Sequence, residues 1–202
     1  MISSSIIEDI KPRCATGLDS FAYYYFDFND IKKQDRRGLL SSLLIQLCTR
    51  SHRAYDILLN QFGKNANGLQ EPSEPDMIQC LKKALDLLRH GRVYIIVDAL
   101  DESPNVGTPS PRENVLKLIK ELVDLRYPNV HFFITSRREV DIQAVLEPLP
   151  FPNVSLDDQE GQKEDIVKYI KSFVESDPIM KRWAPEDRRL VINSLSEKAK
   201  GM

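Results

Sequence analysis

The sequence predicts an α/β fold in which a parallel sheet is flanked by helices on both sides. Two short apolar segments, residues 93–97 and 131–135, run without interruption and end in polar residues, which is typical of strands buried in a parallel sheet. A third segment, the aromatic residues 21–28, precedes them. Helical patterns separate the three segments, and strands that alternate with helices of this length form parallel sheets.

The first half of the chain adds three helices to the aromatic strand. Ile2, Ile6 and Ile10 recur at helical spacing before Pro12, so we expect a short helix that stops at the proline. Two further helices follow the strand, and residues 63–75, rich in Gly, Asn and Pro, are expected to connect them on the surface. The apolar face of one helix consists of Leu39, Leu40, Leu43, Leu44 and Leu47, and that of the other of Met77, Ile78, Leu81, Leu85 and Leu88.

The second half continues the alternation of helices and strands. An amphipathic helix is predicted over residues 115–123, after a proline-rich loop. Beyond the strand at 131–135, the pattern predicts a weaker strand at residues 153–156 and a helix around residues 166–173.

From about Trp183 onward the pattern is purely helical, and this change suggests a domain boundary. We expect an α/β domain over residues 1–178 and the start of a helical subdomain over residues 179–202. At 202 residues and 42% hydrophobic, the chain is long enough for one sizeable core and a small appendage.

Charge and cysteine content exclude several classes of function. The formal net charge of -2 leaves no basic excess to neutralise a polynucleotide backbone, so no nucleic-acid partner is expected. No apolar run approaches the roughly 18 residues that a membrane span needs, and the N-terminus lacks the pattern of a secretory signal. Cys14, Cys48 and Cys80 are odd in number and widely spaced, which suggests neither a disulfide framework nor a zinc site. A cytoplasmic location fits these observations.

Three carboxylates, Asp98, Asp101 and Glu102, follow the strand at residues 93–97. Chemistry is expected where the strands of a parallel sheet end. Asp98 could anchor Mg²⁺ directly or through its waters, Glu102 could polarise a water for in-line attack on a phosphate, and Asp101 could support either role. The alternative is a solvated acidic turn, because short carboxylates favour turns on their own.

The strand at residues 131–135 ends with Thr135, and Ser136 and Arg137 follow it. If this strand adjoins the acidic one, Thr135 or Arg137 lies beside the position of a terminal phosphate, which an arginine can bind bidentately. The alternative is a surface arginine at the edge of the sheet. The amphipathic helix between the acidic and basic segments favours their pairing in one site.

Two other groups of polar or aromatic residues have simpler interpretations. The aromatic residues 23–26 are expected to pack in the core rather than to stack on bases, given the charge balance. Ser3, Ser4 and Ser5 are most simply the polar face of the first helix.

The order and spacing of several unrelated segments resemble the NACHT-type, nephrocystin-3-like NTPase domains of large fungal signalling proteins of the STAND class. The segments that carry the resemblance are SSSII at 3–7, YYYFDF at 23–28, LLSSLLIQLC at 39–48, VDALDE at 97–102, ITSR at 134–137, Asp141 with Ile142, Asp177 with Pro178, Trp183, and EKAKGM at 197–202.

The resemblance implies a P-loop NTPase fold of the ASCE type. By resemblance, Asp98 is the Walker B magnesium carboxylate, Glu102 the catalytic carboxylate and Arg137 the first sensor, with Asp101 and Thr135 also at the nucleotide. The implied cofactors are Mg²⁺ and ATP or GTP. The full-length protein would use the nucleotide to switch its assembly and would couple an N-terminal effector to C-terminal repeats. Expected partners are further copies of the chain or other domains of a larger signalling protein, with no membrane partner.

The phosphate-binding half of such a site is missing, because no G-x-x-x-x-G-K-[ST] motif occurs in the 202 residues. In the family, that loop precedes the helix that here begins at Met1, and its backbone N–H groups, lysine and hydroxyl make most of the phosphate contacts. We therefore expect a truncated domain, from an incomplete gene model or a fragment, that does not hydrolyse nucleotide alone. The alternative is a nucleotide-free pseudo-NTPase that serves as an interaction module.

The missing segment also includes a strand that is central in the family's sheet. Its loss predicts either an exposed apolar edge at residues 131–135 or a strand at 153–156 that closes the gap. Either arrangement predicts marginal stability or self-association.

Overall fold

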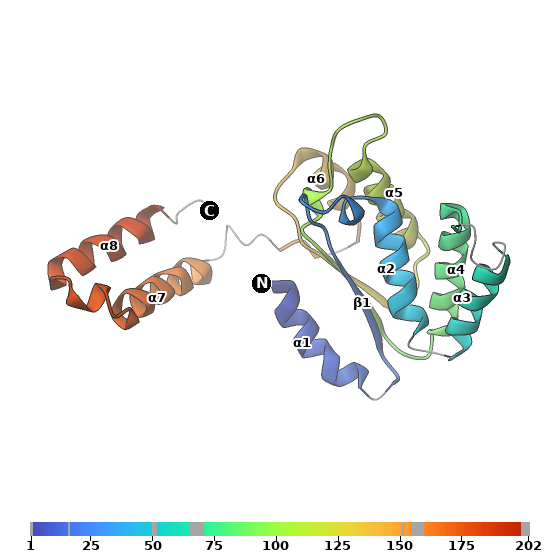
Figure 1. The fold of residues 1–202 in the computed structure, drawn as a ribbon, viewed down its shortest axis with the longest axis horizontal. Helices are drawn as coiled ribbons and strands as arrows, with labels where there is room; N and C mark the ends of the chain where they lie inside the picture. The colour runs from blue at the N-terminus through green and yellow to red at the C-terminus, as the bar shows by residue number, and fades with distance from the viewer. Residues whose placement is uncertain are drawn as a thin grey trace. The chain divides into compact units, whose positions relative to one another are not determined.

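The computed structural model describes residues 2–15, 17–49, 52–64, 71–150, 152–154 and 160–198. The chain divides into two compact units, Met1–Pro150 and Phe151–Met202, and the first contains the sheet (Figure 1). Within the described ranges, no helix is long and apolar enough to cross a lipid bilayer.

Three parallel strands form the sheet of the first unit, in the order β1-β2-β3. They are β1 (Ser20–Tyr25), β2 (Val93–Asp98) and β3 (Val130–Ile134), close to the segments predicted from the sequence. In the register of the sheet, Tyr25 lies beside Asp98, and Val97 lies beside Ile134. All three strands therefore end at the same edge, and the predicted α/β fold with a parallel sheet and flanking helices is confirmed.

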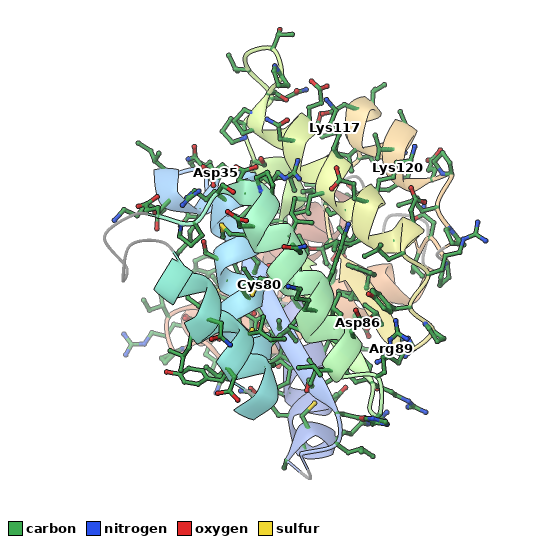
Figure 2. The ribbon with its side chains drawn as sticks, turned by 90° about the vertical axis from the view of Figure 1, so that its right-hand side faces the viewer. Asp35, Cys80, Asp86, Arg89, Lys117 and Lys120 are labelled. Carbon is green, nitrogen blue, oxygen red and sulfur yellow. The ribbon has the colours of Figure 1, made fainter. Side chains whose placement is uncertain are left out.

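One face of the sheet, here called the α2 side, carries most of the core. Helix α2 (Arg36–Cys48) packs on β1 and against α4 (Glu74–Leu87) and α5 (Pro111–Asp124), while α3 (His52–Lys64) packs against α2 and α4. Figure 2 shows α3 and α4 in front of the sheet, with Cys80 of α4 labelled. Fully buried side chains on this side include Leu39, Leu40, Leu43, Leu47, Leu81, Leu85, Val93, Ile95, Val97, Leu100, Leu118 and Ile119.

The opposite face, the α1 side, has a much smaller core. Helix α1 (Ile2–Cys14) packs on β1 and β2, and Figure 1 shows α1 and α2 on opposite sides of β1. Ile7, Cys14, Phe21 and Ile96 are buried there, and partly buried residues surround them: Ile6, Ile10, Tyr25, Tyr94 and Phe133. Tyr24 and Phe26 pack in the α2-side core and Tyr25 against the α1-side core, as predicted, but Tyr23 is exposed, so the prediction of core packing is wrong for that residue.

Side-chain caps determine where the helices of the α2 side begin. A capping residue outside a helix accepts a hydrogen bond from an N–H of the first turn that has no partner within the helix. At the start of α2 the Asp35 side chain accepts from Gly38 N–H. The Ser73 and Ser110 side chains do the same for Asp76 N–H in α4 and Glu113 N–H in α5. Proline occupies the first turn of both α4 and α5, where its missing N–H costs nothing.

Three expectations from the sequence differ from the structure. Helix α1 does not stop at Pro12 but continues to Cys14, because a proline near the end of a helix removes only one hydrogen bond. Helix α3 was not predicted. Asn153 and Val154 are not in a strand, and the 63% exposure of Val154 explains why: no apolar face is buried there. Ser155 and Leu156, the rest of that predicted strand, lie outside the described residues.

The segment after β3 contains a short helix, α6 (Val140–Leu146), which contacts α5. Its residue Ile142 is 3% exposed and joins the core of the α2 side. This contact fixes the path of the chain just beyond Arg137.

In the second unit, the helices predicted around residues 166–173 and after Trp183 are present among the described residues. Helix α7 (Glu160–Ser176) packs against α8 (Pro185–Lys198) and against the 3-10 helix η4 (Met180–Arg182). Between them, the Asp177 carboxylate accepts hydrogen bonds from the N–H groups of Ile179 and Met180. The boundary predicted at residue 178 between an α/β domain and a helical subdomain stays a prediction.

Candidate functional site

The last residue of β2 and the first residue after β3 form the centre of the candidate site. The Thr135 hydroxyl donates a hydrogen bond of 2.6 Å to Oδ1 of Asp98 and accepts one of 3.0 Å from Ala99 N–H. The backbone continues the same pairing, since Thr135 N–H donates to Val97 O and Leu100 N–H donates to Thr135 O. Asp98 and Thr135, predicted from two separate motifs, therefore lie side by side.

Helix α1 contributes a third group that the sequence analysis missed. The Ser3 hydroxyl donates to the same Oδ1 of Asp98. Ser3 is fully buried whereas Ser4 is exposed, so the three serines do not form one polar face as predicted. The spacing held a signal: Ser3 lies one helical turn before Ile7, which packs on the sheet.

The turn after β2 places Asp101 against Arg137. Ala99 has the left-handed conformation (φ 54°, ψ 48°), and the 3-10 helix η3 (Leu100–Glu102) follows with Leu100 fully buried. Oδ1 of Asp101 accepts a 3.0 Å hydrogen bond from Arg137 N–H, and Oδ2 lies 3.5 Å from Arg137 Nε. The Arg137 side chain is 85% exposed, so this ion pair adds little stability and leaves most of the guanidinium open to a ligand.

Glu102 faces a different neighbour from Asp101. Its Oε2 accepts a 3.2 Å hydrogen bond from Phe28 N–H, in the loop after β1. The next residue strengthens this connection, because the Ser103 hydroxyl donates to Gln34 O at 2.7 Å. The structure therefore brings Asp101 to the segment after β3 and Glu102 to the loop after β1, with Asp98 and Thr135 bonded to each other.

A buried arginine beneath the turn was also missed. Arg112, in the first turn of α5, is 8% exposed and donates from Nε to Ser103 O at 2.8 Å and from a terminal nitrogen to Asp101 O at 2.6 Å. Its other terminal nitrogen lies 3.4 Å from both carboxylate oxygens of Asp141 in α6. A cation at the start of a helix opposes the helix dipole, and this local conflict is the only sign of Arg112 that the sequence offers.

The side chains at this edge suit a hard cation better than a soft one. The donors beside β2 and β3 are carboxylate and hydroxyl oxygens, the ligands that Mg²⁺ prefers, and Mg²⁺ is often held by one or two protein carboxylates together with waters and phosphates. Asp98, with Thr135 beside it, would hold such an ion. Across the described ranges, no three His, Cys, Asp or Glu side chains are grouped closely enough to bind a metal by themselves. A magnesium ion held by Asp98 would take its remaining ligands from waters or phosphates.

Comparison with known proteins links the chain to a family. No curated protein and no solved structure is significantly similar to the chain. The model of the family "Nephrocystin 3, N-terminal" matches residues 1–137, more than half of the chain. The matched range begins before Ser3 and ends at Arg137, so it includes all five predicted site residues. The chain belongs to the nephrocystin 3 N-terminal family.

Proposed function

We propose that this chain is part of a NACHT-type nucleotide-binding domain of a STAND-class signalling protein, with a P-loop fold of the ASCE type. The observation that supports the proposal is the convergence of Asp98, Asp101, Glu102, Thr135 and Arg137 at one edge of a parallel sheet. Ligands of α/β proteins bind outside the carboxyl ends of such strands. In this proposal the nucleotide is ATP or GTP, and its binding switches the assembly of the full-length protein.

Each of the five residues has a role in the proposal. Asp98 holds Mg²⁺, with the Thr135 hydroxyl beside it, and Mg²⁺ neutralises charge on the outer phosphates. Glu102 orients the attacking water, and Arg137 binds the terminal phosphate through its exposed guanidinium. Asp101 holds Arg137 in place through the backbone N–H at 3.0 Å.

The chain by itself is proposed not to hydrolyse nucleotide. The 202 residues contain no glycine-rich phosphate loop, and charge-assisted hydrogen bonds of the kind such a loop makes contribute about 1.5–3 kcal/mol each. Since about 1.4 kcal/mol corresponds to a factor of ten in affinity, the absence of three or four of them weakens binding by several orders of magnitude. From a micromolar starting affinity, the smallest of these losses leaves Mg²⁺-dependent binding at about millimolar. We expect no phosphate release above that of Glu102→Gln.

Weak binding of this kind can be tested by NMR titration with MgATP and MgGTP. We expect shift changes at the amides of residues 98–102 and 135–137, lost in Asp98→Asn and kept in the matched control Asp124→Asn. Asp124 is an exposed carboxylate at the far end of α5. Shift changes elsewhere, or changes that survive Asp98→Asn, would disprove the nucleotide site. The DNA upstream of the Met1 codon gives a second test, because an in-frame Gly-Lys-Ser or Gly-Lys-Thr loop would support the proposal.

The second candidate is a nucleotide-free interaction module. It is favoured by the fact that protein groups already bind all three carboxylates: hydroxyls at Asp98, Arg137 at Asp101 and Phe28 N–H at Glu102. Its partners would be further copies of the chain or other domains of a larger signalling protein. A chain that shows no MgATP-dependent shifts but associates in light scattering would support this candidate.

A further inference from the structure

Arg112 connects three segments that are separate in the sequence. Two of its nitrogens bind backbone carbonyls of the turn after β2, those of Asp101 and Ser103, while the third faces the carboxylate of Asp141 in α6. The same turn is also bound by the segment after β3, because Arg137 N–H donates to the Asp101 side chain. Asp101, Arg137, Asp141 and Arg112 therefore form a closed ring of contacts, completed by the short stretch of backbone from Arg137 to Asp141.

We propose that Arg112 is a positioning residue that makes the acidic turn and the 137–141 segment move together. It fixes the backbone of Asp101, and thereby the carboxylate that holds Arg137, while its contact with Asp141 anchors the far end of that segment. Through this ring, displacement of Arg137 or of α6 shifts the acidic turn. A role of Arg112 in nucleotide chemistry rests on the proposed function, whereas the contacts that link the two segments exist without any nucleotide.

The chemistry of the site explains why an arginine is used. A buried cation is costly unless it is paired and hydrogen-bonded, and each of the three Arg112 nitrogens has an acceptor, two of them carbonyls and one a carboxylate. The planar fork of arginine fixes these directions relative to one another, whereas a lysine ammonium is a single point on a flexible stem. Charge alone would therefore not reproduce the link.

The link can be tested in the whole chain, without ligand, through the Arg137 amide. Its hydrogen exchange and proton chemical shift report the bond to Asp101 directly. Arg112→Lys keeps the charge but removes the fork, and Asp141→Asn weakens the third contact with a milder change at a partly exposed residue. The matched control is Asn129→Ala, which also removes a side chain bound to two carbonyls, those of Leu88 and Gly91, but at the opposite edge of the sheet.

We expect Arg112→Lys and Asp141→Asn to speed exchange of the Arg137 amide about tenfold relative to β2 amides of the same variant, the factor that loss of one hydrogen bond produces. They should also move its proton shift upfield, and Asn129→Ala should do neither. If Arg112→Lys leaves the Arg137 amide as protected as Asn129→Ala does, or if all amides accelerate equally, Arg112 only stabilises the fold and the proposal is wrong. MgATP titration of the same variants tests the nucleotide site separately.

Discussion

The two faces of the sheet differ in the size of the core that covers them. On the α2 side, leucines from α2 and α4 and branched residues of the sheet form a large, fully buried core. On the α1 side the core formed by the described residues is smaller and has four buried members, Ile7 and Cys14 of α1 with Phe21 and Ile96 of the sheet. Successive residues of a strand point to opposite faces, so Val97 faces the α2 side while Asp98 faces the α1 side, where Ser3 meets it. The stability of the first unit therefore comes mainly from the α2 side, whereas the Asp98 carboxylate faces the α1 side.

The difference in size between the two cores predicts that truncations of core side chains change the free energy of unfolding most. Leu81→Ala, at a fully buried position of α4, should lower the free energy of unfolding by about 2–5 kcal/mol. Ile7→Ala, on the α1 side, should cost less, because the smaller cluster there can collapse around the missing atoms. Urea denaturation of both variants measures the difference. An equal or larger cost for Ile7→Ala would show that the α1 side contributes as much stability as the α2 side.

The cysteines provide an independent probe, because Cys14 lies on the α1 side while Cys48 and Cys80 lie on the α2 side. The hydrogen bond between Cys48 and Cys80 raises the pKa of the Cys48 thiol and lowers the pKa of the Cys80 thiol, so slow labelling of these two would come from their burial. If α1 detaches more easily than the larger core opens, Ellman's reagent should label Cys14 about a hundredfold faster than the other two.

A Cys14→Ser variant identifies the labelling phases. It should lose the fast phase and keep the slow ones. One common rate for all three thiols in the unaltered chain would mean that both faces open together.

The smallest predicted effect concerns the hydroxyls at Asp98. Ser3→Ala removes one hydrogen bond and should cost about 1 kcal/mol of unfolding free energy. Thr135→Val should cost more, because Ala99 N–H also loses its acceptor. Ser4→Ala, at the exposed neighbouring position, is the matched control and should change stability little. If Ser3→Ala is as stable as Ser4→Ala, the hydrogen bond from Ser3 to Asp98 does not stabilise the packing of α1 on the sheet.

The elements that the sequence predicts well are those with a strong local pattern. The strands at 93–97 and 131–135 and the helices α2, α4 and α5 each show uninterrupted or periodic apolar residues. Helix α3 carried such a signal and was missed, since Ala54, Ile57 and Leu58 recur at helical spacing and pack in the α2-side core. Residues 153–156 alternate polar and apolar side chains, which is typical of a strand, but the described part, Asn153 and Val154, is not paired, and the sequence does not show whether a sheet covers such a segment.

The candidate site was predictable in part for a related reason. Asp98, Asp101 and Thr135 follow strands, so the sequence places them at one edge once the sheet is known to be parallel. Ser3 and Arg112 depend on contacts between distant residues, Ser3 with Asp98 and Arg112 with Asp141. Three successive serines do not show which one faces inward, and an arginine in an amphipathic helix is usually on the surface.

The alignment of β2 with β3 has a consequence for how the site tolerates change. Thr135 reaches Asp98 because Val97 is paired with Ile134, and a slip of one residue would present Ile134 or Ser136 instead. Side chains alternate along a strand, so the same slip would also turn Phe132 out of the α2-side core. An insertion or deletion within β3 would therefore disrupt the core and the site together. Homologues of this chain should vary in length only in the loops outside the strand.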